Sequence, residues 1–353
     1  MQLPDPRGPL SQQVGHVLAG RACEGPAVTA LPLPTGEVLD SEDLQLALWM
    51  LFELHYRGFD GVDPDLEWDP VLIHSRGMLE GCLEGELRGL TAEDVRRAQR
   101  RGGDLAGRLT WLIDDLDRGS LATFLQRSAT VDQFADFMRQ RSIYHLKESD
   151  PQSFVLPRIG GPAKVALAEL QYDEYGAGRP ERLHADMFGR ALDAMALDSG
   201  YGAYIDEASA ATLAMNNVMS MFGLRRRLRG AALGHLAAFE ATSSAPCRRI
   251  VSGIERLGLR PPPRRTSTST SRQTRCTSNW RFAMSARLSP TTSRSWPTTC
   301  CSARPAACGW RRSRERHSSA RGARPRPASD SSRWTRELRD AGNQPEDETS
   351  GSG

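Results

Sequence analysis

Near residue 260 the amino-acid composition of this 353-residue chain changes abruptly. Residues 261–330 contain 13 Ser, 9 Thr, 15 Arg and 8 Pro, but Leu288 is their only Leu, Ile or Val. So few aliphatic side chains cannot offset the backbone entropy lost on folding, about 1–2 kcal/mol per ordered residue. We therefore expect a hydrophobic core only before this point, and a disordered, low-complexity basic tail over residues 261–353.

The same boundary separates an acidic part from a basic part. Residues 1–260 contain 28 Lys or Arg and 36 Asp or Glu, whereas residues 261–353 contain 18 and 7. The isoelectric point of about 8.5 therefore describes neither part. Because the basic excess lies outside the part expected to fold, it gives no reason to expect a nucleic-acid-binding fold.

The chain shows no sign of export or of a membrane span. It has no apolar run of the roughly 18–20 residues that a transmembrane helix needs, and its start, MQLPDPRGPLSQQ, lacks the pattern of a signal peptide. Its seven cysteines include no repeated C-x-x-C pair, which argues against a disulfide framework and a zinc site. We therefore expect a cytoplasmic protein with no membrane partner.

Residues 39–260 show the periodicity of helices and almost no strand-like alternation. Asp40 or Ser41 can cap a first helix, and Thr130 precedes another. Short breaks with Gly or Pro between helices predict an antiparallel all-α bundle. Residues 1–38 have no sustained period and are expected to be a mostly irregular lead-in. Further helices are expected over 71–89, 91–102, 104–117, 119–128, 130–149, 161–175, 180–196, 203–221, 225–242 and 245–257.

Potential metal ligands are densest between Tyr144 and Phe188. Glu181 and His184 form an E-x-x-H pair, which on a helix places a carboxylate and an imidazole on one face. Helix bundles that bind two irons use such pairs, because carboxylates suit ferric iron and imidazole retains ferrous iron. Taken alone, the pair is more simply explained as a surface salt-bridge ladder with Arg179 and Arg182. His235, farther along, is expected to be a hydrogen-bonded core residue rather than a ligand.

Four segments resemble, in the same order, the iron-containing redox enzyme family, part of the haem-oxygenase-like di-iron oxidase and oxygenase superfamily. The resemblance spans about residues 40–260. It implies a haem-oxygenase-like helical bundle that binds two irons and activates O2 to oxidise a small-molecule substrate. The segments are ELHYRGFDGVDPDLEWDP (53–70), YHLKESDPQSFVLPRI (144–159), ELQYDEYGAGRPERLHADMF (169–188) and RGAALGHLAAFEATSS (229–244).

Carried over residue by residue, the resemblance implies metal ligation by Glu148, Glu174 and His184, with Glu181 as an extra carboxylate. The family also has a last core helix with the motif H-x-x-x-D-x-x-H, which supplies three further ligands. This chain lacks that motif and has TSTSTSRQTRCTSNW (266–280) in its place. Its C-terminal core helices are thus replaced by the basic tail.

The replaced helix can be recovered from the same codons. Back-translated with GC-rich codons and read one nucleotide earlier, residues 266–280 can encode YFDEHVEADAVHEQL, which contains the missing motif. We therefore favour a frameshift after about residue 262 over a natural basic tail.

Two hypotheses for function follow. The first is an iron-dependent redox enzyme that activates O2 at a di-iron site and is impaired in this translation, since three expected ligands are missing. The alternative is a non-catalytic helical binding protein with a basic, disordered interaction tail. Iron stoichiometry discriminates between them.

Overall fold

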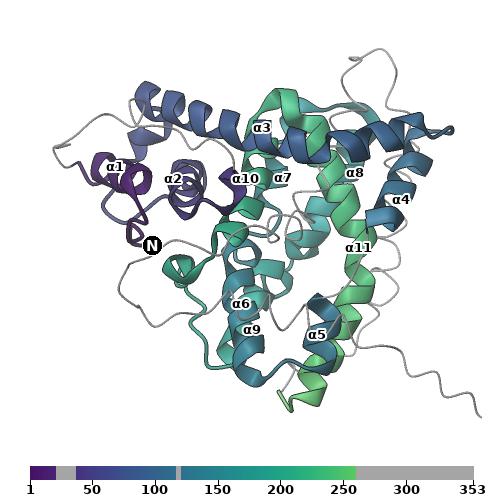
Figure 1. The fold of residues 1–353 in the computed structure, drawn as a ribbon. Helices are drawn as coiled ribbons and strands as arrows, with labels where there is room; N and C mark the ends of the chain where they lie inside the picture. Colours follow the sequence, from purple (N-terminus) through teal and green to yellow (C-terminus); the bar gives the residue numbers. More distant parts are fainter. Residues whose placement is uncertain (21–36, 117–120, 260–353) are drawn as a thin grey trace, which may run out of the picture.

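The computed structural model describes residues 1–20, 37–116 and 121–259 (Figure 1). In these ranges the chain forms eleven α-helices and short 3₁₀ turns, with no β-strand. The predicted all-α fold is therefore confirmed. None of the helices in these ranges combines the length and apolarity needed to cross a bilayer. The predicted tail over 261–353 and the proposed frameshift lie outside the described residues.

The N-terminal segment is more ordered than the sequence predicted. Instead of an irregular lead-in, it contains α1 (Pro9–Leu18), which buries Leu10, Val14 and Leu18 at four-residue spacing. This face packs against α2 (Glu42–Glu53). The free amides at the start of α1 donate to the Asp43 carboxylate of α2, from the backbone of Leu10 at 2.9 Å and of Ser11 at 2.7 Å. Contacts with α2 thus stabilise a short helix within the segment that was expected to be irregular.

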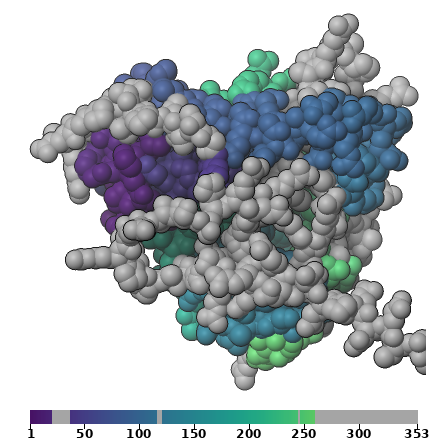
Figure 2. All heavy atoms as spheres, in the orientation of Figure 1, coloured from purple at the N-terminus to yellow at the C-terminus, as the bar shows by residue number. Residues whose placement is uncertain are grey.

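Helix α2 lies at the centre of the larger apolar cluster. Its start is confirmed, since the Ser41 side chain accepts from the backbone N–H of Leu44. Nearly all of α2 is buried, with α1 on one side and α10 (Ala210–Leu224) and α3 (Pro70–Arg100) on others. Helix α3 forms the blue band along the upper edge of the visible face (Figure 2), and α4 (Leu105–Leu116) packs against it.

Two predicted helix breaks are wrong. Helix α3 runs continuously through the expected break between 89 and 91, because Thr91 faces inward and is 1 % exposed. Helix α11 (Arg229–Arg256) continues through Pro246, although two helices were expected. Packing along α5 (Leu121–Arg127) explains this continuity. The Arg256 side chain donates to the carbonyls of Leu125 and Ala129 at the end of α5.

The predicted ligands lie on or between four helices in the middle of the chain. These helices are α6 (Val131–His145), α7 (Asp150–Ser153), α8 (Gly161–Glu174) and α9 (His184–Ala194). The turn after α6 and the residues that follow it touch both main apolar clusters, because Leu146 packs with residues of α5, α9 and the end of α11, while Val155, just after α7, packs in the cluster around α2. This turn, which contains Glu148, is therefore held between two parts of the core.

The start of α6 offers a test of local stability. The Thr130 side chain accepts from the backbone N–H of Gln133 at 3.3 Å, and the Gln133 side chain accepts from that of Thr130 at 2.9 Å. We expect Thr130→Ala to lower the free energy of unfolding by about 1 kcal/mol, because it leaves a helix N–H without its partner. Urea denaturation measures the loss, and Thr130→Ser should retain most of the stability. An unchanged midpoint in Thr130→Ala would contradict the capping role.

Candidate metal centre

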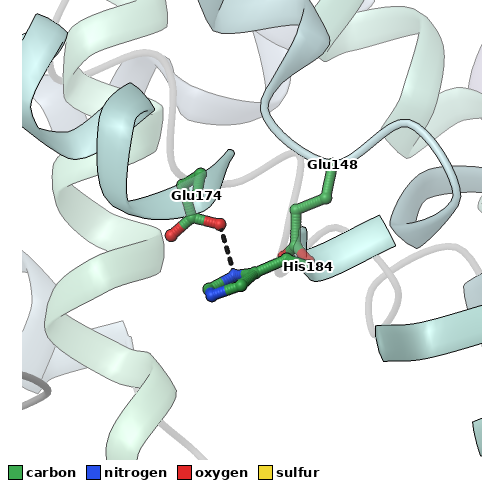
Figure 3. A group of neighbouring side chains, drawn as sticks. All are labelled: Glu148, Glu174 and His184. Atoms are coloured by element: carbon green, nitrogen blue, oxygen red, sulfur yellow. Dashed lines mark ion pairs between the residues drawn. The ribbon is translucent and has the colours of Figure 1, made fainter. Parts of the chain in front are cut away.

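Three ligand-type side chains meet from three separate elements (Figure 3). Glu148 lies in the turn after α6, Glu174 is the last residue of α8, and His184 is the first residue of α9. One ligand atom from each lies within 4.8 Å of the others, and His184 Nδ1 is 2.6 Å from Glu174 Oε2. The structure thus brings together three of the four residues that the sequence singled out as metal ligands.

Glu181 is not part of this group. It lies in a 3₁₀ turn (Pro180–Arg182), its side chain is exposed, and Leu183 has an extended backbone at φ −55° and ψ 124°. Because α9 begins only at His184, the expectation that Glu181 and His184 share one helical face is wrong. Among the described residues Glu181 forms no ion pair with Arg179 or Arg182, so the salt-bridge ladder is not formed either.

The charges of the three residues are mutually dependent. Burial and the nearby Glu174 carboxylate raise the pKa of Glu148 to about 7. The hydrogen bond to Glu174 raises the pKa of His184 above its ordinary value of 6.5. Protonation of His184 therefore offsets part of the negative charge where two half-buried carboxylates repel each other.

A further carboxylate, Glu240, faces the same group from α11. Its neighbour Phe239 contacts the ring of Tyr144 at a centroid distance of 6.1 Å, which brings this part of α11 to the end of α6. Burial, followed by Glu174 and Glu148, raises the pKa of Glu240 to about 7. Sequence reasoning missed this residue as a ligand. The available signal was a lone carboxylate within the apolar stretch 230–246.

His145 lies beside the group but its nitrogens are already used. Arg141 Nη2 lies 3.3 Å from His145 Nε2 and, as a permanent donor, makes that nitrogen the acceptor. Nδ1 therefore donates to the Arg141 carbonyl at 3.0 Å. Burial and Arg141 hold the pKa of His145 well below 6.5, and its ring stacks on Phe188. His145 is thus a neutral wall of the site rather than a ligand.

His235 lies away from the three converging side chains. It lines a cavity of about 10 Å³ together with Gln152, Met219 and Phe222. Burial lowers the pKa of His235 to about 4, so the ring is neutral at physiological pH. In the described ranges no hydrogen bond or ion pair links it to Glu148, Glu174 or His184. Its expected burial is confirmed, whereas a hydrogen-bond partner is not seen among these residues.

The donor set suits iron. Carboxylate oxygens and an imidazole nitrogen are the ligands of non-haem iron sites in helical proteins. A dication at the position where Glu148, Glu174 and His184 converge would offset the carboxylate charge that His184 now balances only in part. The residues present therefore fit a metal site, with oxygen donors in the majority.

Comparison with known proteins agrees with this chemistry. Residues 135–265 match the family model described as iron-containing redox enzyme, and this segment includes Glu148, Glu174, His184 and Glu240. A search of curated proteins found no match. The resemblance stated from the sequence is thus confirmed over residues 135–265, and this part of the chain carries the pattern of the iron-containing redox enzymes.

Proposed function

We propose that this chain is an iron-dependent enzyme that uses O2 to oxidise a small molecule, with Glu148, Glu174 and His184 as its iron ligands. The observation that carries the proposal is their convergence within 4.8 Å from three separate elements, inside the segment that matches the iron-containing redox enzymes. Bound ferrous iron would supply the electrons that reduce O2.

The protein's own residues hold and shield the metal position. Glu174 and His184 lie at adjoining ends of α8 and α9, so the turn between these helices sets their separation. His145, stacked on Phe188, covers one side with neutral, mostly apolar surface. Such a wall limits access of water and keeps the charges of Glu148 and Glu174 strongly coupled to a cation.

Glu240 extends the donor set. Burial, and then the same carboxylates that approach the metal position, raise its pKa. A cation at that position would therefore favour the ionised form of all three carboxylates. We propose that Glu240 supplies a further oxygen ligand from α11. We expect Glu240→Gln to weaken ferrous iron binding about 10-fold, by loss of one charged donor, in a competition assay with a chromogenic chelator.

The number of irons depends on the missing helix. The family resemblance implies two irons and three ligands from an H-x-x-x-D-x-x-H helix, which this chain lacks. The family match ends at residue 265, close to the change in composition, which supports the proposed frameshift. The chain as written therefore has a set of ligands that suits one iron rather than two.

Parallel expression of the chain as written and of a frame-restored version tests the proposal. We expect about two irons per chain and O2 consumption after ferrous loading in the restored version, and weaker, substoichiometric iron in the chain as written. Iron is counted per chain by elemental analysis. No iron in either version, together with salt-sensitive nucleic-acid binding, would instead support a helical binding protein with a basic tail.

A further inference from the structure

Glu148 differs from the other two ligands because it lies in a turn rather than at a helix end, and both of its chain neighbours are tied to other helices. We propose that Gln171 is a positioning residue that holds Glu148 toward Glu174 and His184. This inference rests on the proposed metal site and adds to it a residue that touches no metal.

Gln171 forms a hydrogen bond with the backbone directly after Glu148. Its side chain is 97 % buried, and Nε2 donates to the Ser149 carbonyl and to Ser153 Oγ, both at 2.8 Å. Gln171 lies on α8 one turn before Glu174, so the same helical turn carries one ligand and holds the neighbour of another. The distance between Glu148 and Glu174 therefore depends on this side chain.

The backbone that Gln171 holds is in an unfavourable conformation. Ser149 has φ 68° and ψ −7°, in the left-handed region that residues with a Cβ rarely adopt. Such a conformation costs about 1–3 kcal/mol and persists only where surrounding contacts stabilise it. Without the Gln171 hydrogen bond, Ser149 is expected to return to negative φ and redirect the backbone that carries Glu148.

The residue before Glu148 is fixed from the opposite direction. Lys147 Nζ lies 2.8 Å from Glu53 Oε2 of α2, and both side chains are almost completely buried. The Tyr201 hydroxyl donates to the other Glu53 oxygen at 2.6 Å. Glu148 is thus placed between Lys147, held by α2, and Ser149, held by α8.

A second set of hydrogen bonds closes the turn around Gln171. The Tyr175 hydroxyl donates to Asp150 Oδ1 at 3.0 Å, so the Ser153 hydroxyl, 2.8 Å away, donates to Tyr175. Ser153 Oγ then accepts from Gln171. Tyr175 directly follows Glu174, and the network therefore links the turn that carries Glu148 to the helix end that carries Glu174.

The test replaces Gln171 with methionine, which has a similar shape but no donor. In the full chain we expect Gln171→Met to weaken anaerobic ferrous iron binding about 10- to 100-fold. Loading with Co²⁺ adds a second readout, because its visible absorption bands change when a carboxylate ligand is displaced. Unchanged affinity and unchanged Co²⁺ bands in Gln171→Met would overturn the positioning role.

Asn217 provides a closely matched control. It is fully buried, and its Nδ2 donates at 2.8 Å to the carbonyl of Gln45 and at 2.8 Å to that residue's side-chain oxygen, tying α10 to α2. Asn217→Leu removes the same kind of contact far from the ligands in sequence. We expect it to lower the melting temperature as Gln171→Met does, while leaving iron affinity and the Co²⁺ bands unchanged. Equal losses of affinity in both variants would overturn the proposal.

Adding Ser149→Gly to Gln171→Met tests the mechanism. It also provides a second variant to measure if Gln171→Met alone fails to fold. Glycine adopts positive φ without strain, so the double variant Gln171→Met/Ser149→Gly should regain part of the lost affinity. No recovery in a folded double variant would overturn the role assigned to Ser149. If the unaltered chain binds neither metal, the proposed function fails. Crystal structures then test the positioning role separately. An unmoved Glu148 in Gln171→Met overturns that role, and a displaced Glu148 supports it.

Discussion

Replacing Lys147 with methionine is expected to lower the free energy of unfolding by about 3–5 kcal/mol, the range found when one partner of a buried ion pair is removed. The Lys147 side chain is 2 % exposed and that of Glu53 is fully buried. The ammonium also lies over the rings of Tyr56 and Trp49, at 4.2 and 5.5 Å from their centroids. The variant leaves the buried Glu53 carboxylate without its ion-pair partner. Urea denaturation followed by circular dichroism measures the loss.

The double variant Glu53→Gln/Lys147→Met separates charge from packing. A neutral amide at position 53 still accepts the Tyr201 hydroxyl, and neither member of the ion pair leaves an unpaired charge behind. We therefore expect the double variant to recover most of the stability lost in Lys147→Met. If both variants are equally unstable, packing of the lysine stem rather than an uncompensated charge explains the loss.

Replacing Glu148 with glutamine is expected to weaken iron binding by at least about 100-fold and yet to stabilise the metal-free chain at pH 8. Burial and Glu174 raise the folded-state pKa of Glu148 to about 7 from an ordinary value of 4.5. The folded state therefore binds the proton more tightly than the unfolded state. The stability that this proton contributes is present below pH 4.5 and is lost as pH rises toward 7.

Glutamine at position 148 never ionises, so the variant avoids this loss. We expect it to exceed the parent in free energy of unfolding by about 1–3 kcal/mol at pH 8, with the difference narrowing toward pH 5. Thermal unfolding with and without ferrous iron measures both effects, since iron should stabilise only the parent. Glu169→Gln, at an exposed position on α8, serves as control. A variant less stable than its parent at pH 8 would contradict the pKa shift.

The sequence predicted elements where local chemistry decides them. Ser41 and Thr130 cap helices because their side chains accept from amides only three residues away, and such contacts form wherever the helix forms. The break expected at Pro246 was wrong because α11 packs on α5, and Arg256 at its end donates to the Leu125 carbonyl. Long-range packing of this kind has no local signature.

The residues of the candidate site likewise include some that the sequence could identify and some that it could not. Residue types and family pattern identified Glu148, Glu174 and His184, since a metal requires specific donors at characteristic separations. They also suggested Glu181, which is lost from the group because Leu183 is extended and α9 begins one residue later. The roles proposed for Glu240 and Gln171 could not be predicted from the sequence, because their partners lie on other elements of the fold.

The sequence by itself determined the all-α fold of the described residues and the residue types of the candidate metal site, because periodicity, capping and donor chemistry are properties of neighbouring residues. Only the tertiary structure decided which carboxylates meet and which contacts surround the left-handed Ser149 beside Glu148. Burial, coupled charges and the hydrogen bond from Gln171 to Ser149 exist only once α6, α8, α9 and α11 are packed together.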